Sequence, residues 1–209
     1  MQIAILLYDR FTALDAVGPY EVLSNLPQAQ VIFAAERDGP VRADTGSLAL
    51  TADARIADLP SPDIVLVPGG PGQAAMMSDG PVHRWLRNAD VTSTWTTSVC
   101  TGSLILAAAG LLAGRRATTY WQAIDQLAAL GAIAVRERVV TDGKYVTGAG
   151  VSAGIDMALT LAARIAGPQT AQAIQLGIEY DPQPPYDAGS PDKAPERIVA
   201  ALRAGSRFK

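Results

Sequence analysis

Cysteine occurs once in the sequence, at a position where a thiol can act as a nucleophile. Cys100 directly follows residues 93–99, which are rich in Thr, Trp and Val, and precedes an Ala/Leu-rich stretch, so we expect a strand that runs into a helix with the cysteine at the corner. Gly102 would relieve crowding at such a nucleophile elbow, although Ser98 stands where a second glycine is usual. Unpaired N–H groups at a helix N-terminus favour the thiolate. The alternative is a buried cysteine that serves only as a small hydrophobic residue.

A glycine-rich loop at residues 68–72 follows another predicted strand, residues 63–67. Corners that follow parallel strands open on the same edge of a sheet, so this loop and Cys100 are expected to lie close together. The backbone N–H groups of Gly69 and Gly70 could then form an oxyanion hole. The alternative is a tight turn whose glycines provide only backbone freedom.

Asp15 stands where the first predicted strand gives way to the first helix. An Asp in that position commonly caps the helix. The functional alternative is a carboxyl group that exchanges protons with Cys100 or with the substrate. The only histidine, His83, is followed by Arg-Trp-Leu-Arg and is expected on a solvent-facing helix turn, so the cysteine has no predicted histidine base.

Neither a dinucleotide nor a metal is predicted. In the glycine run at residues 148–154 the third glycine falls one residue late, and no acidic residue follows about twenty positions on. These glycines are expected to form a tight strand-to-helix turn beside the site. His, Cys and carboxylate residues do not cluster at metal-ligand spacing, so we expect no metal and no cofactor.

Apolar runs alternate with helical patterns along the chain, which predicts an α/β fold with a mostly parallel sheet and helices on both faces. We see no linker or repeat and expect one domain over residues 1–209. Strands are expected at residues 2–8, 30–35, 63–67 and 93–99, with short extended pieces within 37–53 and a hairpin at 138–147. Helices are expected at residues 15–24, 81–87, 101–112, 120–130, 152–166, 169–178 and 194–202.

The composition argues against several classes of protein. Hydrophobic residues make up 49% and charged residues 18%, a globular mixture, and the 17 basic residues are spread along a chain of net charge −3, so no nucleic-acid partner is expected. The longest apolar run, residues 104–114, is too short for a membrane span. A lone cysteine with no recognisable export signal indicates the cytoplasm.

Four motifs stand out in order along the chain, at residues 14–23, 67–70, 97–103 and 148–156. Together they resemble the DJ-1/PfpI superfamily. The tail motifs at residues 178–182 and 189–194 narrow the resemblance to its isonitrile hydratase branch. The resemblance implies a flavodoxin-like three-layer sandwich, a homodimer and a small-molecule isonitrile substrate.

The same resemblance implies that Cys100, Asp15 and Thr101 are catalytic. It changes our interpretation of Asp15 from helix cap to catalyst. Thr101 stands where many peptidase relatives carry a histidine, which argues against a peptidase. Tyr120 occupies a place where relatives often have histidine and is expected to line the substrate pocket. Trp121 and the strand containing Trp95 are further candidates for the pocket wall, although core packing is their default role.

The implied reaction hydrates an isonitrile to an N-substituted formamide through a thioimidate on Cys100. Asp15 would supply and recover the proton, which requires a raised pKa. Backbone N–H groups of Gly70 and Thr101 would hold developing charge. Two alternatives remain: another DJ-1/PfpI enzyme, of the glyoxalase, deglycase or peptidase-like kind, and a non-enzymatic redox sensor or ligand-binding regulator. Regulators of this kind usually append a helix-turn-helix region, for which the chain has no room after the predicted domain. The loop at residues 180–191 has no predicted role.

Overall fold

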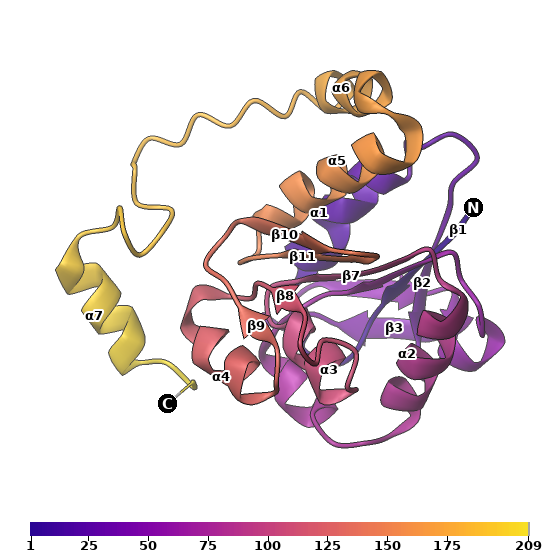
Figure 1. The fold of residues 1–209 in the computed structure, drawn as a ribbon, viewed down its shortest axis with the longest axis horizontal. Coiled ribbons are helices and arrows are strands. Elements are labelled where there is room, and N and C mark those ends of the chain that lie inside the picture. The colour runs from indigo at the N-terminus through magenta and orange to yellow at the C-terminus, as the bar shows by residue number, and fades with distance from the viewer. Residues whose placement is uncertain (209) are drawn as a thin grey trace.

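A seven-stranded sheet forms the centre of the computed structural model, which describes residues 1–208 (Figure 1). The strand order is β10-β11-β7-β6-β1-β2-β5, and every neighbouring pair is parallel except β10 with β11. The predicted mostly parallel sheet is therefore confirmed. The strands are β1 (Gln2–Leu6), β2 (Gln30–Ala35), β5 (Ala54–Arg55), β6 (Ile64–Val67), β7 (Trp95–Val99), β10 (Val139–Asp142) and β11 (Tyr145–Gly148).

Helices cover both faces of the sheet, as predicted. Figure 1 shows α1 (Ala13–Leu23) and α5 (Ala153–Ala166) on one face and α2 (Pro81–Thr92) and α3 (Gly102–Ala108) on the other. Among the described residues, no helix is both long and apolar enough to cross a membrane. The remaining helices are α4 (Ile124–Ala129), α6 (Pro168–Gly177), α7 (Glu196–Ala204) and the 3-10 turns η1 (Ile56–Asp58), η2 (Pro71–Met76) and η3 (Trp121–Ala123).

The central strands are apolar because both of their faces are covered. All four residues of β6 are buried, and so are the last four residues of β1. Such continuous apolar runs are typical of parallel strands between two helical layers. Because β1, β6 and β7 are neighbours with the same direction, the loops that follow them meet at one edge of the sheet.

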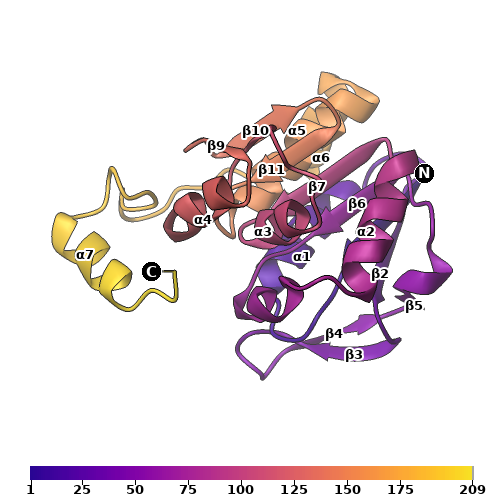
Figure 2. The same cartoon turned by 60° about the horizontal axis from the view of Figure 1, so that its bottom comes forward.

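Two small sheets lie beside the main one. β3 (Gly39–Arg42) and β4 (Ala49–Ala52) form an antiparallel pair, which accounts for the extended pieces predicted within residues 37–53. Figure 2 shows this pair below β2 and β5, at the edge of the molecule. β8 (Arg116–Ala117) and β9 (Ile133–Ala134) pair in parallel and were not predicted.

Several helices have boundaries that differ from the prediction. The helix expected over residues 101–112 ends at Ala108, because Gly110 adopts a φ of 87° that breaks the helical backbone. The helix expected at 120–130 begins instead as the 3-10 turn η3.

The prediction that His83 faces solvent is wrong. The helix expected at residues 81–87 continues to Thr92, and its buried face includes His83, whose exposed fraction is 2%. One ring nitrogen, Nε2, lies 2.7 Å from the carbonyl oxygen of Met76. The apolar side chains of Trp85 and Leu86 lie on the same buried face of α2, so His83 is buried with them when this face packs against the protein.

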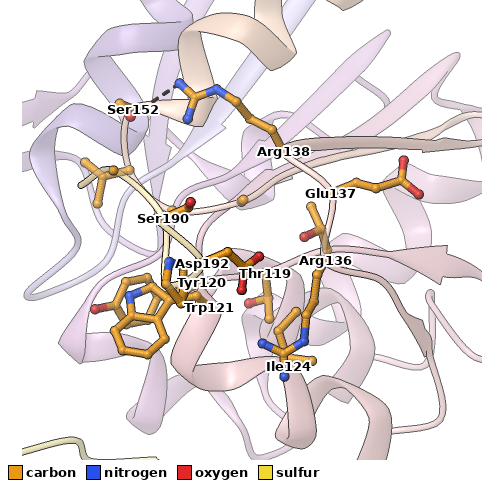
Figure 3. A pocket seen from close by; sticks show the side chains of 16 residues that line it. Thr119, Tyr120, Trp121, Ile124, Arg136, Glu137, Arg138, Ser152, Ser190 and Asp192 are labelled. Carbon is orange, nitrogen blue, oxygen red and sulfur yellow. Dashed lines mark hydrogen bonds between the residues drawn. The ribbon is translucent and has the colours of Figure 1, made fainter. Parts of the chain in front are cut away.

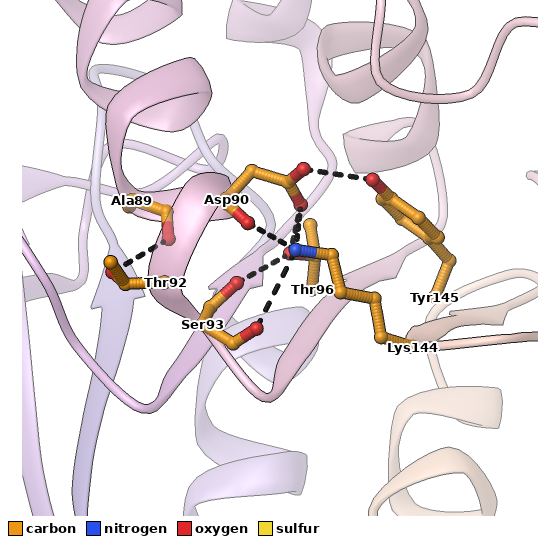
Figure 4. Close-up of polar contacts among 7 residues, drawn as sticks. All are labelled: Ala89, Asp90, Thr92, Ser93, Thr96, Lys144 and Tyr145. Carbon is orange, nitrogen blue, oxygen red and sulfur yellow. Dashed lines mark hydrogen bonds and ion pairs between the residues drawn. The ribbon is translucent and has the colours of Figure 1, made fainter.

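A polar cluster closes the edge of the sheet at which β7 and β11 begin (Figure 4). Asp90, near the end of α2, accepts hydrogen bonds from Thr96 Oγ1 at 2.6 Å and Tyr145 Oη at 2.8 Å. Lys144 Nζ forms an ion pair with Asp90 Oδ1 at 3.2 Å and also donates to the Asp90 carbonyl. These contacts tie α2 to the hairpin of β10 and β11.

Candidate active site

Cys100 adopts a left-handed backbone conformation, with a φ of 56°. Such a conformation costs a non-glycine residue roughly 1–2 kcal/mol, so the surroundings must hold it in place. Its N–H donates to the carbonyl oxygens of Gly148 at 3.1 Å and Ala149 at 2.7 Å. Its own carbonyl accepts hydrogen bonds from Thr119 Oγ1 at 2.9 Å and Ser103 Oγ at 3.1 Å. The strained turn is therefore held on both sides of the residue.

The turn between β7 and α3 has the strand–cysteine–helix form that the sequence predicted. A Cβ atom at Gly102 would lie 2.0 Å from the carbonyl oxygen of Val67, so only glycine fits two residues after the cysteine. Ser98, two residues before it, is fully buried in β7. The cysteine itself is buried, with an exposed fraction of 6%.

Asp15 lies in the first turn of α1, but it does not cap that helix. Thr12 occupies the N-cap position, so the cap interpretation is wrong. The carboxyl group is fully buried, and Asp15 Oδ2 accepts a hydrogen bond of 2.9 Å from the backbone N–H of Gly69. Within residues 1–208, Oδ1 has no hydrogen-bond partner. A buried carboxyl oxygen without a partner is available to exchange a proton with a bound molecule.

The glycine loop after β6 joins the two corners of the site, as its position predicted. Gly70 N–H donates to Thr101 Oγ1 at 3.0 Å, and the Gly69 N–H is taken up by Asp15. A Cβ atom at Gly69 would lie 2.5 Å from the Thr101 nitrogen and 2.9 Å from Asp15 Oδ2, too close for any side chain. Both N–H groups thus hold side chains of the site in position, whereas we expected them to face a substrate oxyanion.

Burial governs the protonation of the two central groups. It raises the pKa of Asp15 to about 7, although the Gly69 N–H and the nearby Cys100 side chain lower it. Burial also raises the pKa of the Cys100 thiol, and the negative charge of Asp15 raises it further. The backbone N–H groups of Thr101 and Val151 act in the opposite direction. Two adjacent buried acids cannot both ionise readily, so a negative charge on either group raises the pKa of the other.

We expected the N–H groups at the start of α3 to favour the thiolate; they do act in that direction, but burial has the larger effect and raises the pKa of the thiol. α3 has only seven residues, and the cost of burying the charge exceeds the effect of the nearby N–H groups. The raised pKa expected for Asp15, in contrast, agrees with its burial.

Sequence reasoning missed three residues near the sulfur. Tyr8, at the end of the first predicted strand, donates from its hydroxyl to the Pro68 carbonyl at 2.8 Å, and the charges of Asp15 and Cys100 raise its pKa in addition to burial. Val151 belongs to the glycine run that was expected beside the site, so its region, though not its role, was visible in the sequence. Arg207 lies far along the chain, and no motif marks it.

A cavity of about 420 Å³ adjoins the segment that wraps Cys100 (Figure 3). Ala149, Gly150 and Val151 form one wall, and the predicted pocket residue Tyr120 lies against Gly150. The end of the loop at residues 180–191, for which no role was predicted, also borders this cavity. The other lining residues are Thr118, Thr119, Trp121, Ile124, Arg136, Glu137, Arg138, Ser152, Gly189, Ser190, Pro191 and Asp192.

Other candidates lie outside this region. Trp121 lines the cavity, but Trp95 is at the beginning of β7, the end opposite Cys100, and packs against the core. The polar contacts of His83 within residues 1–208 are with Met76 and Asp79. In the same part of the chain, no group of three or more His, Cys, Asp or Glu residues is arranged to hold a metal ion.

Comparison with known proteins gives matches over most of the chain. The DJ-1/PfpI family profile matches residues 1–164. The isonitrile hydratase of Pseudomonas putida is 47% identical over 203 residues, which are 97% of this chain and 89% of that protein. The transcriptional regulator CdhR of Pseudomonas aeruginosa is 37% identical over 144 residues, but these cover 68% of this chain and only 42% of the regulator.

Solved structures have the same architecture. A THiJ/PfpI family protein from Pseudomonas syringae superposes with a TM-score of 0.94 at 39% identity, covering 97% of this chain and 84% of its own. DJ-1beta from Drosophila melanogaster superposes with a TM-score of 0.78 at 22% identity over 87% of this chain and 98% of its own, a likeness of fold alone.

Proposed function

Because the chain belongs to the DJ-1/PfpI family, we propose that it is an isonitrile hydratase, a hydro-lyase that converts R–NC and water into an N-substituted formamide. The observation that carries the proposal is the pairing of Cys100 with a buried, partly unpaired Asp15 carboxyl of raised pKa, with no histidine in contact. The similarity to the hydratase from Pseudomonas putida over nearly the full chain supports it.

The reaction needs one nucleophile and one proton carrier. The Cys100 thiolate adds to the terminal carbon of the isonitrile while Asp15, in its acid form, delivers a proton to that carbon, giving R–N=CH–S on the enzyme. The backbone N–H groups of Thr101 and Val151 stabilise the negative charge on sulfur before attack. Asp15 is left as a carboxylate.

Water completes the reaction on the same carbon. The Asp15 carboxylate takes a proton from water as the hydroxyl adds, and passes that proton to the substrate nitrogen. The hydroxyl proton then returns to Asp15 as the C=O bond forms and the Cys100 thiolate leaves. The formamide departs, and one proton again remains between the carboxyl and the thiol, so the cycle balances.

We further propose that the organic substituent of the isonitrile occupies the cavity beside Cys100. The aromatic side chains of Tyr120 and Trp121 and the apolar Ile124 offer it an apolar wall (Figure 3). Thr101, held by the Gly70 N–H, keeps the backbone after the cysteine in place. The glycines at 69 and 70 would act through Asp15 and Thr101 more than through direct contact with substrate.

The assembly and the compartment belong to the same proposal. We expect one domain and a homodimer, as the resemblance to the family implies. We also expect the protein in the cytoplasm, because a single buried free thiol suits a reducing compartment. Light scattering after gel filtration tests the dimer directly.

The test of function follows formamide production from a panel of aliphatic and aromatic isonitriles. Wild-type protein is expected to turn over at least one of them, and Cys100→Ser is expected to lose at least about 10³-fold in kcat. Retained turnover in Cys100→Ser would contradict the covalent route. Turnover of methylglyoxal or a chromogenic peptide without any turnover of isonitriles would instead indicate another enzyme of the family, and a peroxide-dependent mass gain on Cys100 without turnover would indicate a sensor.

A further inference from the structure

The C-terminal segment leaves the body of the protein and returns to the cysteine site. Figures 1 and 2 show the yellow segment that follows α6 running outward to α7 and then turning back. None of the residues of α7 is buried, so packing of the helix on this chain does little to hold the segment in place. The contacts that bring it back come from a few side chains at its end.

Arg207 makes the principal contact, with the turn that also holds the catalytic side chains. Its Nη2 donates to the Gly70 carbonyl at 2.9 Å and its Nη1 donates to the Pro71 carbonyl at 2.7 Å. A third, longer contact of 3.4 Å joins Nη2 to Gln73 Oε1. A planar guanidinium that spans two adjacent carbonyls fixes their relative orientation, as a lysine could not. Gly70 is the residue whose N–H holds Thr101.

The same segment also contacts the opposite wall of the site. The ring of Phe208 lies 6.4 Å from that of Tyr120, and the guanidinium of Arg203 lies over Trp121 at 5.6 Å. Gln122 Nε2 donates to the Leu202 carbonyl at 3.0 Å. The segment thus bridges the glycine turn on one side and the aromatic wall on the other, with the cysteine site between them.

Through these contacts the guanidinium of Arg207 is held at the turn that lies against Thr101, so its charge and that of an ionised Cys100 interact. Ionised Cys100 and ionised Tyr8 each raise the pKa of Arg207, against the effect of its partial burial, and Arg207 in turn lowers the pKa of Tyr8. The other charged group that faces it, Arg10, has the same sign. A nearby cation stabilises a negative charge on sulfur and leaves the neutral thiol almost unaffected, so the charge of Arg207 favours the thiolate.

We propose that Arg207 is a positioning residue of the cysteine site: it fastens the C-terminal segment across the Gly70–Pro71 turn and places a positive charge that favours the Cys100 thiolate. The proposal deepens the proposed function and rests on it for the reaction, but the reactivity of the thiol can be measured without any isonitrile. The segment then both narrows the entrance and helps to activate the nucleophile.

The experiment measures the rate of alkylation of Cys100 by iodoacetamide as a function of pH, for wild type, Arg207→Gln and Arg207→Lys. The matched control is Arg197→Gln, an exposed arginine of α7. Arg207→Gln is expected to move the pH midpoint of alkylation upward and to lower the rate near pH 7 by about 3- to 10-fold, as loss of one nearby charge implies. Arg207→Lys keeps the charge and is expected to retain most of the midpoint, and Arg197→Gln is expected to match wild type.

Three outcomes decide the proposal. An Arg207→Gln profile that coincides with wild type overturns it, and so does an equal change in Arg197→Gln, because the effect would then belong to net charge alone. A midpoint that stays in place while the alkylation rate rises at all pH values assigns Arg207 a role in closure only and overturns the electrostatic part. If wild type hydrates no isonitrile but the alkylation midpoint still depends on Arg207, the proposed function fails while this inference stands.

Discussion

Asp15 and Asp90 are carboxyl groups at opposite edges of the same sheet, and their surroundings differ in kind. Asp90 has a hydroxyl from Thr96, a hydroxyl from Tyr145 and the ammonium of Lys144 (Figure 4). Asp15 is buried completely and has one backbone N–H on one oxygen. The carboxylate of Asp90 joins elements of the fold through its several donors, whereas burial raises the pKa of Asp15 to about 7, so that its carboxyl group can give up and recover a proton.

The largest difference between Asp15 and Asp90 should appear in the rate of isonitrile hydration. Asp15→Asn removes the proton carrier without changing the size of the side chain, and we expect the rate of formamide production to fall by about 10²- to 10⁴-fold. Steady-state kinetics on an isonitrile that wild type accepts would measure it. Asp90→Asn is the matched control, and its rate should stay within about 3-fold of wild type. Equal losses in the two variants would contradict a specific role of Asp15 in proton transfer.

The pH dependence of stability should separate them next. The pKa of Asp15 is raised from 3.8 to about 7 in the folded chain, so the folded state binds the proton more tightly than the unfolded state. Its contribution is present in full below pH 3.8 and is lost as pH rises toward 7. Urea unfolding of wild type against Asp15→Asn should therefore show the wild type losing up to about 4 kcal/mol relative to the variant between pH 4 and pH 8. A constant difference between the two proteins would mean that the carboxyl does not carry the raised pKa.

The smallest effect concerns the joining role of the second carboxyl. Asp90→Ala removes the carboxylate that accepts from the hydroxyls of Tyr145 and Thr96 and forms the ion pair with Lys144. Because that pair is partly exposed, we expect a loss of about 1–3 kcal/mol of unfolding free energy. Denaturant unfolding at pH 7 measures it, with Asp187→Ala, from the exposed pair with Lys193, as a control of little expected effect. A neutral Asp90→Ala would show that the hairpin needs no such tie.

Long apolar runs in the sequence allowed the longer strands of the sheet to be predicted, and the shortest strands were missed. Apolar runs such as residues 63–67 stand between turn-forming residues and have no other stable place than a buried strand, so the strands that carry the site were found. The two-residue strands β8 and β9 have no periodicity to detect. His83 was misplaced because its polarity was weighed without the Trp85 and Leu86 beside it, which draw that face inward.

Site residues that directly follow a strand could be predicted from the sequence, whereas those contributed by a segment distant along the chain could not. Cys100, Asp15 and the glycine loop all follow parallel strands, so one topological rule brings them together. The sequence could not show which acceptor each glycine N–H would find, because that depends on the exact positions of the Asp15 and Thr101 side chains. Arg207 approaches Gly70 across more than a hundred residues, and no local pattern records such a contact.

The left-handed backbone of Cys100 has a consequence for how this chain can change. Glycine adopts that conformation at no steric cost, so a glycine at this position would relieve roughly 1–2 kcal/mol while deleting the sulfur. The loss of the contacts that the buried sulfur makes would act against this gain. The strained backbone is therefore kept at the position where the proposed reaction needs a nucleophile, although glycine would adopt this conformation without strain.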